Sequence, residues 1–228
     1  KKCRAFASRV FRYGAATGRC NADPTSILQG ALVSPKARHY AAILEPAKLG
    51  DLLRAINAWD GPAVTRYALK ITPHVYVRPG ELRHAEWNEF DFEKAIWTIA
   101  EGKMKARRTH VVPLSRQVLK LFQELKAATG GKGYVFPTLY STQRPMSENT
   151  VNVALRRLGF DKDEVTAHGF RSTASSFLNE CGKWHPDAIE RALAHGDSNA
   201  VRGIYNRGNY WDERVRMAQW WSDYLDHL

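Results

Sequence analysis

Residues able to hold and cleave a phosphate ester recur at four places between positions 78 and 205. The first is Arg78 in "VRPGELRHAEW". It stands just before an expected helix start, where a guanidinium and free backbone N–H groups can hold an anion together. Glu81 follows three residues later and is close enough to orient Arg78. A surface ion pair between the two side chains would explain the same spacing.

The second place is the basic stretch "EGKMKARRTHVVPLS", which we interpret as a hairpin with a basic tip. Such a tip can enter a DNA groove or contact phosphates, and a lysine there can deliver a proton to a leaving oxygen. An edge hairpin kept soluble by its lysines is the alternative. The candidates for DNA contact are Lys103, Lys105, Arg107 and Arg108, and either lysine could be the proton donor.

The third and fourth places contribute two histidines, an arginine and a tyrosine. In "TAHGFRSTASSF", His168 and Arg171 stand three residues apart at the start of an expected helix. Both can therefore face one point, and the helix N-terminus adds positive potential. In "AHGDSNAVRGIY", His195 ends one expected helix and Tyr205 lies on or near the next. Either histidine or the tyrosine alone would more often be structural.

One reaction needs all of these side chains, namely cleavage of a phosphodiester through a covalent intermediate. Two guanidiniums can hold the non-bridging oxygens and offset the charge that develops on them. A tyrosine can attack phosphorus and conserve the bond energy. A lysine can protonate the departing 5′ oxygen, while a histidine takes the tyrosine's proton or holds the phosphate. Because cationic side chains supply the charge, we expect no metal and no other cofactor.

Two metal-dependent chemistries fit the sequence less well. Two-metal cleavage needs clustered carboxylates. The nearest cluster lies in an expected connecting loop and consists of Asp161, Asp163 and Glu164. A zinc site would have to be built from His168, His185 and His195, whose spacings match no known ligand pattern.

The composition favours a polyanionic partner. The chain has 34 Lys and Arg against 23 Asp and Glu, a net charge of +11. Nucleic acid is the commonest partner of such a chain, although charge that serves solubility alone gives the same total. No apolar run approaches the roughly 18 residues that span a bilayer, and no signal peptide is recognisable. Cys3, Cys20 and Cys181 form no framework, so we expect a cytoplasmic location.

The elements expected around these residues begin with a separate piece. Residues 1–17 predict a helix that ends at Gly18, and residues 21–39 carry Pro, Gly and Ser without a clear period, which predicts a linker. Because the chain starts with this helix and without a methionine, we expect residues 1–20 to be the tail of a truncated domain. Residues 40–228 are then the main domain.

The main domain is predicted to be mostly helical, with one small sheet. Period-two segments at 87–92, 95–100 and 109–114 predict three antiparallel strands. Helical periodicity predicts the other elements. They lie at 46–56, from Pro62 until Pro73 interrupts the helix, after Pro79, from Ser115 to Gly130, from Ser147 to Gly159, and at 170–181, 188–193 and 217–228. This order gives an α+β class, mostly α.

Six segments, taken in order, resemble the tyrosine recombinase family of phage-type and genomic-island integrases. They are "RPGELRHAEW", "MKARRTHVVPLS", "RPMSENTVNVALRRLG", "TAHGFRSTASSFLNE", "PDAIERALAH" and "YNRGNYWDERVRMAQWWSDYLD". The resemblance runs from about residue 40 to the end, and the helix at 1–17 is similar to the tail of the family's core-binding domain. The segments are also similar to the subgroup that inserts islands at tRNA genes.

The resemblance implies a role for each candidate residue. The two catalytic arginines are Arg78 and Arg171, supported by the acidic Glu81; the two histidines are His168 and His195; the hairpin lysine is Lys105; and the nucleophile is Tyr205. The spacing to Pro113 favours Lys105 over Lys103. Tyr210 is a rival nucleophile five residues further on. "ITPHVYV" before Arg78 departs from the family's smaller residues, so we expect different packing behind that arginine.

The resemblance implies the catalytic fragment of a site-specific recombinase that breaks and rejoins DNA through a 3′-phosphotyrosyl link. Such a protein integrates or excises phage or island DNA in the bacterial cytoplasm, at the nucleoid. It would be a monomer when free and a homo-tetramer on double-stranded attachment sites, helped by accessory DNA-bending proteins. A DNA-binding module without chemistry and a type IB topoisomerase, which shares the chemistry, are the alternatives.

Overall fold

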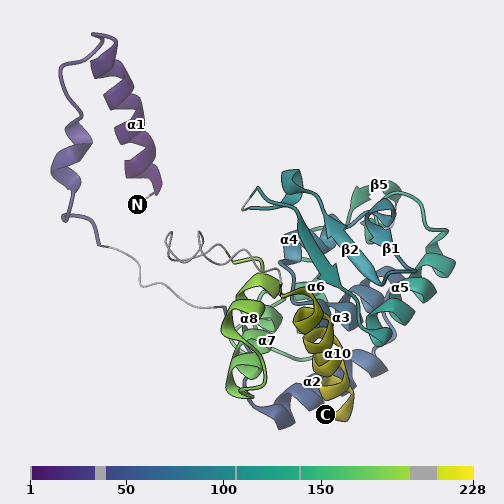
Figure 1. The fold of residues 1–228 in the computed structure, drawn as a ribbon. Coiled ribbons are helices and arrows are strands. Elements are labelled where there is room, and N and C mark those ends of the chain that lie inside the picture. Colours follow the sequence, from purple (N-terminus) through teal and green to yellow (C-terminus); the bar gives the residue numbers. More distant parts are fainter. Residues whose placement is uncertain (1, 34–39, 106, 139, 196–209) are drawn as a thin grey trace. The chain divides into compact units, whose positions relative to one another are not determined.

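The computed structural model describes residues 2–33, 40–105, 107–138, 140–195 and 210–228 (Figure 1). The chain divides into two compact units, Lys1–His39 and Tyr40–Leu228. Among the described residues, no helix has both the length and the apolar character needed to cross a membrane.

The first unit consists of helix α1 (Lys2–Ala16) and the 3-10 helix η1 (Pro24–Leu28). Asp23 caps η1 by accepting a hydrogen bond from the Thr25 backbone, and it also accepts one from Ser8 of α1 at 2.5 Å. The segment expected as a linker therefore contains structure held to α1. That this unit is the tail of a core-binding domain stays a prediction.

The second unit is built around α3 (Ala63–Val75), as Figure 1 shows. This helix packs against five others. They are α2 (Pro46–Ala58), α5 (Arg116–Thr129), α6 (Thr150–Arg157), α7 (Gly169–Glu180) and α10 (Trp211–His227). Two shorter helices are α4 (Pro79–Arg83) and α8 (Pro186–Ala192). Leu69 and Ile71 of α3 are fully buried in the resulting core. The predicted mostly helical class is confirmed.

The predicted three-stranded antiparallel sheet is also confirmed. Its strands, in the order β1-β2-β3, are β1 (Phe90–Asp91), β2 (Ile96–Ile99) and β3 (His110–Pro113). Phe90 stacks on the fully buried Trp97, with ring centroids 5.3 Å apart, and packs on Phe122 of α5 at 4.6 Å. These aromatic contacts fix the sheet to the helices. The 3-10 helix η2 (Trp87–Glu89) takes the first half of the predicted strand at 87–92.

A second, two-stranded sheet was not predicted. It pairs β4 (Pro137–Thr138) with β5 (Ser141–Pro145), and no side chain of either strand is buried. Because neither strand has an apolar face, their sequence carries no period-two signal. A third 3-10 helix, η3 (Glu101–Lys103), lies in the connection between β2 and β3.

The prediction that Pro73 interrupts its helix was wrong. Pro73 lies inside α3, which continues to Val75 and ends at Tyr76 in the left-handed region with φ 35°. A proline in a last turn removes only one backbone hydrogen bond. The Pro73 carbonyl gains a partner, because Trp221 of α10 donates its indole N–H to it at 2.8 Å.

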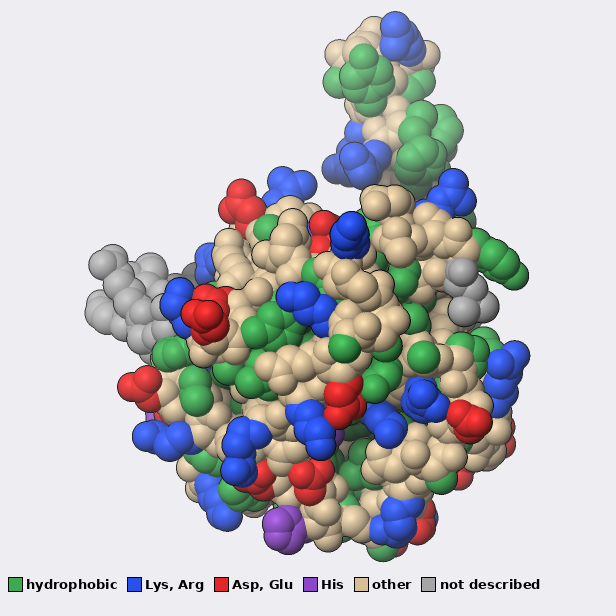
Figure 2. Space-filling model, turned by 90° about the vertical axis from the view of Figure 1, so that its right-hand side faces the viewer, with side chains coloured by type: hydrophobic (Ala, Val, Ile, Leu, Met, Phe, Trp, Pro, Cys, Tyr) green, Lys and Arg blue, Asp and Glu red, His purple; other side chains and the backbone are tan. Residues whose placement is uncertain are grey.

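Charged side chains of both signs are mixed on the face of the molecule shown in Figure 2. Lysines and arginines are scattered there among Asp and Glu, without one continuous basic area. The net charge of +11 is therefore not concentrated on this face.

Candidate active site

Arg78 is held by Glu81 through both its backbone and its side chain. Arg78 is the N-cap of α4, and Glu81 is the third residue of that helix. One Glu81 oxygen accepts from the Arg78 backbone N–H at 2.8 Å, and the other accepts from Nη1 at 2.7 Å. Glu81 is only 5% exposed. The pair is therefore largely buried, in contrast to the surface pair that the spacing also allowed.

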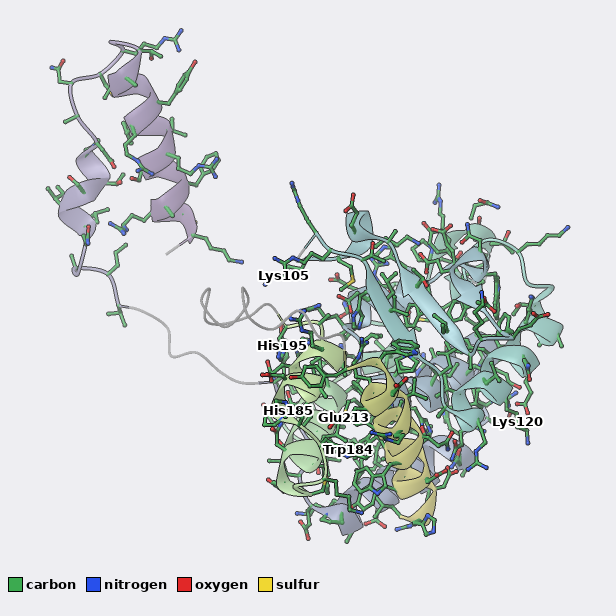
Figure 3. All side chains as sticks on the ribbon, viewed as in Figure 1. Lys105, Lys120, Trp184, His185, His195 and Glu213 are labelled. Carbon is green, nitrogen blue, oxygen red and sulfur yellow. The ribbon has the colours of Figure 1, made fainter. Side chains whose placement is uncertain are left out.

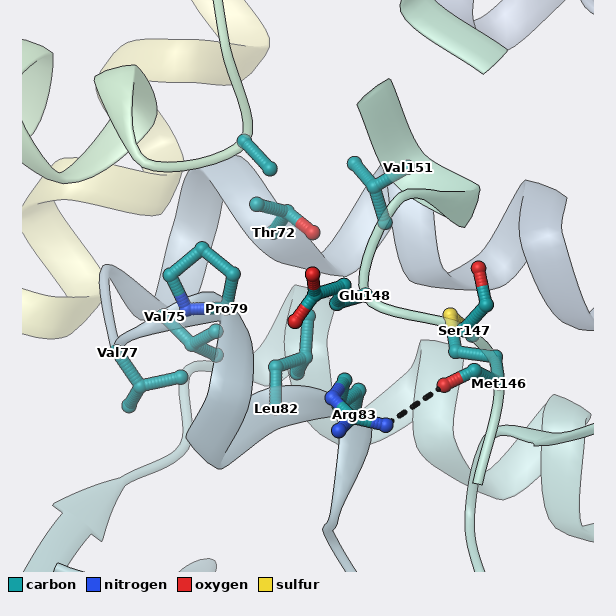
Figure 4. A pocket seen from close by; sticks show the side chains of 11 residues that line it. Thr72, Val75, Val77, Pro79, Leu82, Arg83, Met146, Ser147, Glu148 and Val151 are labelled. Carbon is teal, nitrogen blue, oxygen red and sulfur yellow. Dashed lines mark hydrogen bonds between the residues drawn. The ribbon is translucent and has the colours of Figure 1, made fainter. Parts of the chain in front are cut away.

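The segment before Arg78 forms the packing behind α4. Figure 4 shows a pocket lined by Val75, Val77, Pro79 and Leu82, with the Glu148 side chain pointing into it. Arg83 donates to the carbonyl oxygen of Met146 at 3.0 Å and so joins α4 to the residue after β5. The bulky residues of "ITPHVYV" thus serve as core behind the arginine, as Val75, Tyr76 and Val77 are all buried.

Arg171 is a buried cation in the first turn of α7, with 5% of its surface exposed. Its guanidinium donates to the carbonyl of Tyr76 at 3.0 Å and to the carbonyl of Leu193. Burial lowers the pKa of Arg171 to about 10, and the nearby charge of Arg78 acts in the same direction. The side chain therefore stays protonated at neutral pH.

The end of α8 brings the two arginines together. Arg171 reaches Leu193 and Arg78 donates to Ala194 at 3.1 Å, which is the next carbonyl along the chain. Helix C-termini leave carbonyl oxygens without intrahelical partners and carry partial negative charge. The two cations satisfy these oxygens immediately before His195. The His195 ring is held by Glu190, with Nδ1 2.8 Å from Oε2.

Two further residues near the C-terminal end of α8 were not predicted from the sequence. His110 of β3 is buried and hydrogen bonds to the backbone of Ala192, one residue before Leu193. Arg214 of α10 is buried and donates to the carbonyl of Val111, beside His110. A histidine in a short strand and an arginine on a helix give no signal in the sequence, because their roles depend on contacts between distant segments.

His168 lies near both arginines, at the start of α7. It is the N-cap residue of α7, and its ring lies against Tyr40, with centroids 4.2 Å apart. Burial lowers the pKa of His168, and the charges of Arg171 and Arg78 lower it further. The imidazole is therefore neutral at pH 7. Gly169 is required next to it, since a Cβ there would lie 1.9 Å from the carbonyl oxygen of Ala41.

Arg78, Lys105 and His168 line one open groove with a volume of about 590 Å³. Lys105 lies in the connection between β2 and β3, and Figure 3 shows it and His195 on the same side of the unit. Arg107 and Arg108 are exposed in the same connection. The groove thus carries cations from α4 and the hairpin, beside the neutral imidazole of His168.

Lys103 differs from the other predicted DNA-binding residues. Its ammonium lies 2.6 Å from Glu86 and 2.5 Å from Glu89, and it donates to the carbonyl of His84 at 3.0 Å. Three acceptors occupy its three N–H groups. Contact between Lys103 and a DNA phosphate would require breaking one of these bonds.

The predicted nucleophile, Tyr205, lies outside the described residues. Its rival Tyr210 is the N-cap of α10, with its ring stacked on His185 at a centroid distance of 5.1 Å. His185 precedes α8, whereas the arginines reach the other end of that helix, next to His195. A helix rises about 1.5 Å per residue, so His185 lies roughly 12 Å along the helix axis from Leu193. No group of three metal-ligating side chains occurs among the described residues.

The chain is similar to known integrases in both sequence and structure. The model of the phage integrase family matches residues 43–211. The integrase of Enterobacteria phage P4 is 42% identical over 231 residues, covering 95% of this chain and 52% of that protein. The prophage integrase IntS of Escherichia coli (strain K12) is 36% identical over 226 residues, covering 99% and 58%. This chain thus spans only about half of its relatives' length.

Two solved structures share the fold at low sequence identity. The Tn1549 transposon integrase in complex with circular intermediate DNA superposes with a TM-score of 0.64 at 15% identity, covering 95% of this chain and 77% of that one. A lambda integrase dimer bound to a core site gives 0.63 at 18% identity, covering 87% and 71%. From the family model and the relatives together, the chain belongs to the phage integrase family.

Proposed function

We propose that this chain is the DNA-cleaving part of a site-specific recombinase. The observation that carries the proposal is that Arg78 and Arg171 donate to consecutive carbonyls at one helix end, directly before His195. In addition to burial, the charge of Arg78 lowers the pKa of Arg171, so the two guanidiniums create one region of positive potential that a bound anion would offset. Family membership supports a phosphodiester as that anion, since the solved relatives include integrases bound to DNA.

In the proposed reaction, the phenol oxygen of Tyr205 attacks a phosphorus atom whose non-bridging oxygens are held by Arg78 and Arg171. The bond between Tyr205 and phosphorus forms while the bond to the 5′ oxygen breaks, which leaves a 3′-phosphotyrosyl link. The phenol proton passes to His168 or His195. Lys105 gives a proton to the 5′ oxygen, which leaves as a hydroxyl group. Rejoining reverses these steps with a different 5′ hydroxyl.

The position of Tyr210 supports Tyr205 as the nucleophile. Tyr210 stacks on His185 at the start of α8, away from the carbonyls that collect the arginines. We further propose that the protein acts on double-stranded attachment sites as a homo-tetramer, is a monomer when free, and works with accessory DNA-bending proteins. Insertion at tRNA genes also stays a proposal.

The test is a search for a covalent adduct with DNA. The chain is incubated with a pool of duplexes that carry one nick at a fixed position and randomised sequence around it. Cleavage next to a nick releases a short strand that diffuses away, so the adduct accumulates. We expect a protein–DNA band that survives denaturation and also forms in the presence of EDTA, since no step uses a metal. Sequencing of the trapped DNA identifies the preferred site.

Two matched variants assign the nucleophile. Tyr205→Phe should abolish the band, whereas Tyr210→Phe should retain it. The reverse pattern would assign the chemistry to Tyr210. If the wild-type chain binds DNA but gives no adduct on any duplex, it is a binding module. Relaxation of supercoiled DNA by the monomer would instead indicate a topoisomerase.

A further inference from the structure

We propose that Lys103 is a positioning residue, which sets the place of Lys105 relative to Arg78 through its ion pairs with Glu86 and Glu89. This inference rests on the proposed function, in which Lys105 is the proton donor. The three residues Lys103, Glu86 and Glu89 are called the Lys103 cluster below. Its members come from two segments that the groove needs in a fixed relation, the hairpin and the chain that follows α4.

The cluster is held rigidly on the side of η2. One Glu89 oxygen pairs with Lys103, and the other accepts from the indole N–H of Trp97 at 3.0 Å and from the Glu86 backbone at 3.2 Å. Trp97 is fully buried in the sheet. The side chain of Glu89 is only 10% exposed. The carboxylate that receives Lys103 therefore has little freedom to move.

The cluster also determines where the hairpin connection begins. Met104, the residue after Lys103, is buried, and its carbonyl accepts from the Arg107 backbone at 3.0 Å. Lys105 is thus exposed in a turn directly after two anchored residues. Its side chain lines the groove that also contains Arg78 and His168.

The same pairs join the hairpin to the element that carries Arg78. The three acceptors of Lys103 belong to His84, Glu86 and Glu89, which immediately follow α4. Arg78 is the N-cap of that helix. The Lys103 cluster and the short helix α4 therefore connect Lys105, the proposed proton donor, to Arg78.

The charge balance keeps the cluster intact at neutral pH. Burial alone would lower the pKa of Lys103, but the hydrogen bonds and charges of Glu86 and Glu89 outweigh burial, so the pKa is raised. Without the ammonium, the two carboxylates would repel each other and a DNA phosphate in the groove. Loss of Lys103 should therefore displace the turn that carries Lys105.

The test compares two scissile phosphates in the nicked duplex found above. One has the ordinary 5′ oxygen, and the other has a bridging 5′ sulfur. A thiol ionises near pH 8.5, far more easily than an alcohol, so the sulfur leaves as a thiolate without a proton donor. Single-turnover rates of adduct formation are measured for each variant on both duplexes, and thermal melting confirms that each variant is folded.

We expect Lys105→Met to slow cleavage at oxygen by about 100-fold or more, the usual contribution of a general acid, and to cleave at sulfur within a few-fold of wild type. Lys103→Met should slow cleavage at oxygen by about 10-fold or more and should also be rescued by sulfur, as should the double variant Glu86→Gln with Glu89→Gln. Arg78→Lys should be slow on both duplexes, because its role is to hold the phosphate.

The matched control is Lys94→Met. Lys94 forms an exposed ion pair with Asp91 in a nearby turn. The cleavage rates of the Lys94→Met variant should therefore match those of wild type on both duplexes. The proposal is overturned if Lys103→Met is equally slow on both duplexes, if it matches wild type on oxygen, or if sulfur rescues Lys103→Met but not Lys105→Met. If the wild-type chain forms no adduct with the oxygen duplex and none with the sulfur duplex, the proposed function is refuted instead.

Discussion

At the scale of single residues, the carbonyl oxygens of Ala192, Leu193 and Ala194 organise the candidate site. They bind His110, Arg171 and Arg78, which come from three different elements. A helix end offers such oxygens in a row, spaced by one residue. The arginines are thereby positioned before any phosphate arrives, which reduces the ordering that binding would otherwise require.

His110 leads to a prediction about stability and pH. Burial, followed by the charges of Arg214 and Arg171, lowers the pKa of His110 to about 3. In the unfolded chain a histidine takes up a proton near pH 6.5, so below that pH the unfolded state binds one more proton than the folded state. The free energy of unfolding should therefore fall as the pH drops from about 6.5 towards 3, by at most about 1.4 kcal/mol per unit for this residue.

Urea unfolding at several pH values between 7 and 4 measures this fall. His110→Gln keeps a side-chain N–H for the backbone of Ala192 but does not titrate. Its free energy of unfolding should therefore decrease less with falling pH than that of wild type. His227→Gln, at an exposed position, should fall in parallel with wild type. Parallel curves for His110→Gln and wild type would show that folding does not lower the pKa of His110.

At the scale of elements, two serines illustrate how a helix start is chosen. Ser115 caps α5 as predicted, since its oxygen accepts from the Val118 backbone N–H. Ser147 was expected to open α6, but that helix begins at Thr150, after Asn149. The exposed Ser147 hydroxyl accepts from the Thr150 hydroxyl at 3.3 Å, and the Ser147 carbonyl accepts from the Thr150 backbone N–H at 3.1 Å. The two serines look alike in sequence and differ in burial.

Ser115→Ala should therefore destabilise the protein, and Ser147→Ala should not. Ser115 is buried, and its oxygen also accepts a hydrogen bond from Ser222 of α10 at 2.7 Å. Its loss removes a cap and one hydrogen-bond partner of the buried Ser222 hydroxyl, which keeps His74 Nδ1 at 2.9 Å, so the cost should be about 1–2 kcal/mol. Ser147→Ala should stay within about 0.5 kcal/mol of wild type. Urea unfolding of both variants checks this, and equal stabilities would contradict the capping role.

At the scale of the whole molecule, the excess of positive charge has a testable consequence for DNA binding. The chain carries +11, and the exposed basic residues next to the groove include Lys105, Arg107 and Arg108. Each cation that neutralises a DNA phosphate releases condensed counterions, so affinity depends steeply on salt. Because this chain spans about half of its relatives' length, we expect weak binding and little or no complete recombination.

Binding of a random duplex should weaken by about 10³-fold or more between 50 and 200 mM salt, as for proteins with roughly 6–10 phosphate contacts. The double variant Arg107→Gln with Arg108→Gln should lower the slope of log affinity against log salt by about 2. The control with Lys94→Gln and Lys120→Gln, both exposed, should keep the wild-type slope. Fluorescence anisotropy measures both, and equal slopes would exclude the hairpin from the DNA interface.

The local patterns of the chain were enough to predict most of its elements. Apolar periodicity, Ser115 and Gly130 defined α5, and alternating residues defined the three-stranded sheet, because these features depend only on neighbours along the chain. Residue types and spacing also selected Arg78, His168 and Arg171 as phosphate-binding candidates and Glu81 as the residue that orients Arg78. The sheet of β4 and β5 was not predicted, because its strands have no buried face.

Contacts between distant segments gave each candidate its environment. Lys103 and Lys105 are both basic residues of one hairpin, yet only the fold brings Glu86 and Glu89 to Lys103. His110 and Arg214 enter the site because β3 and α10 pack beside α8. Burial, pKa and ion pairing depend on which side chains meet across the core. The spacing of residues along the chain does not encode these contacts. They are decided only by how the helices and the sheet pack together in the tertiary structure.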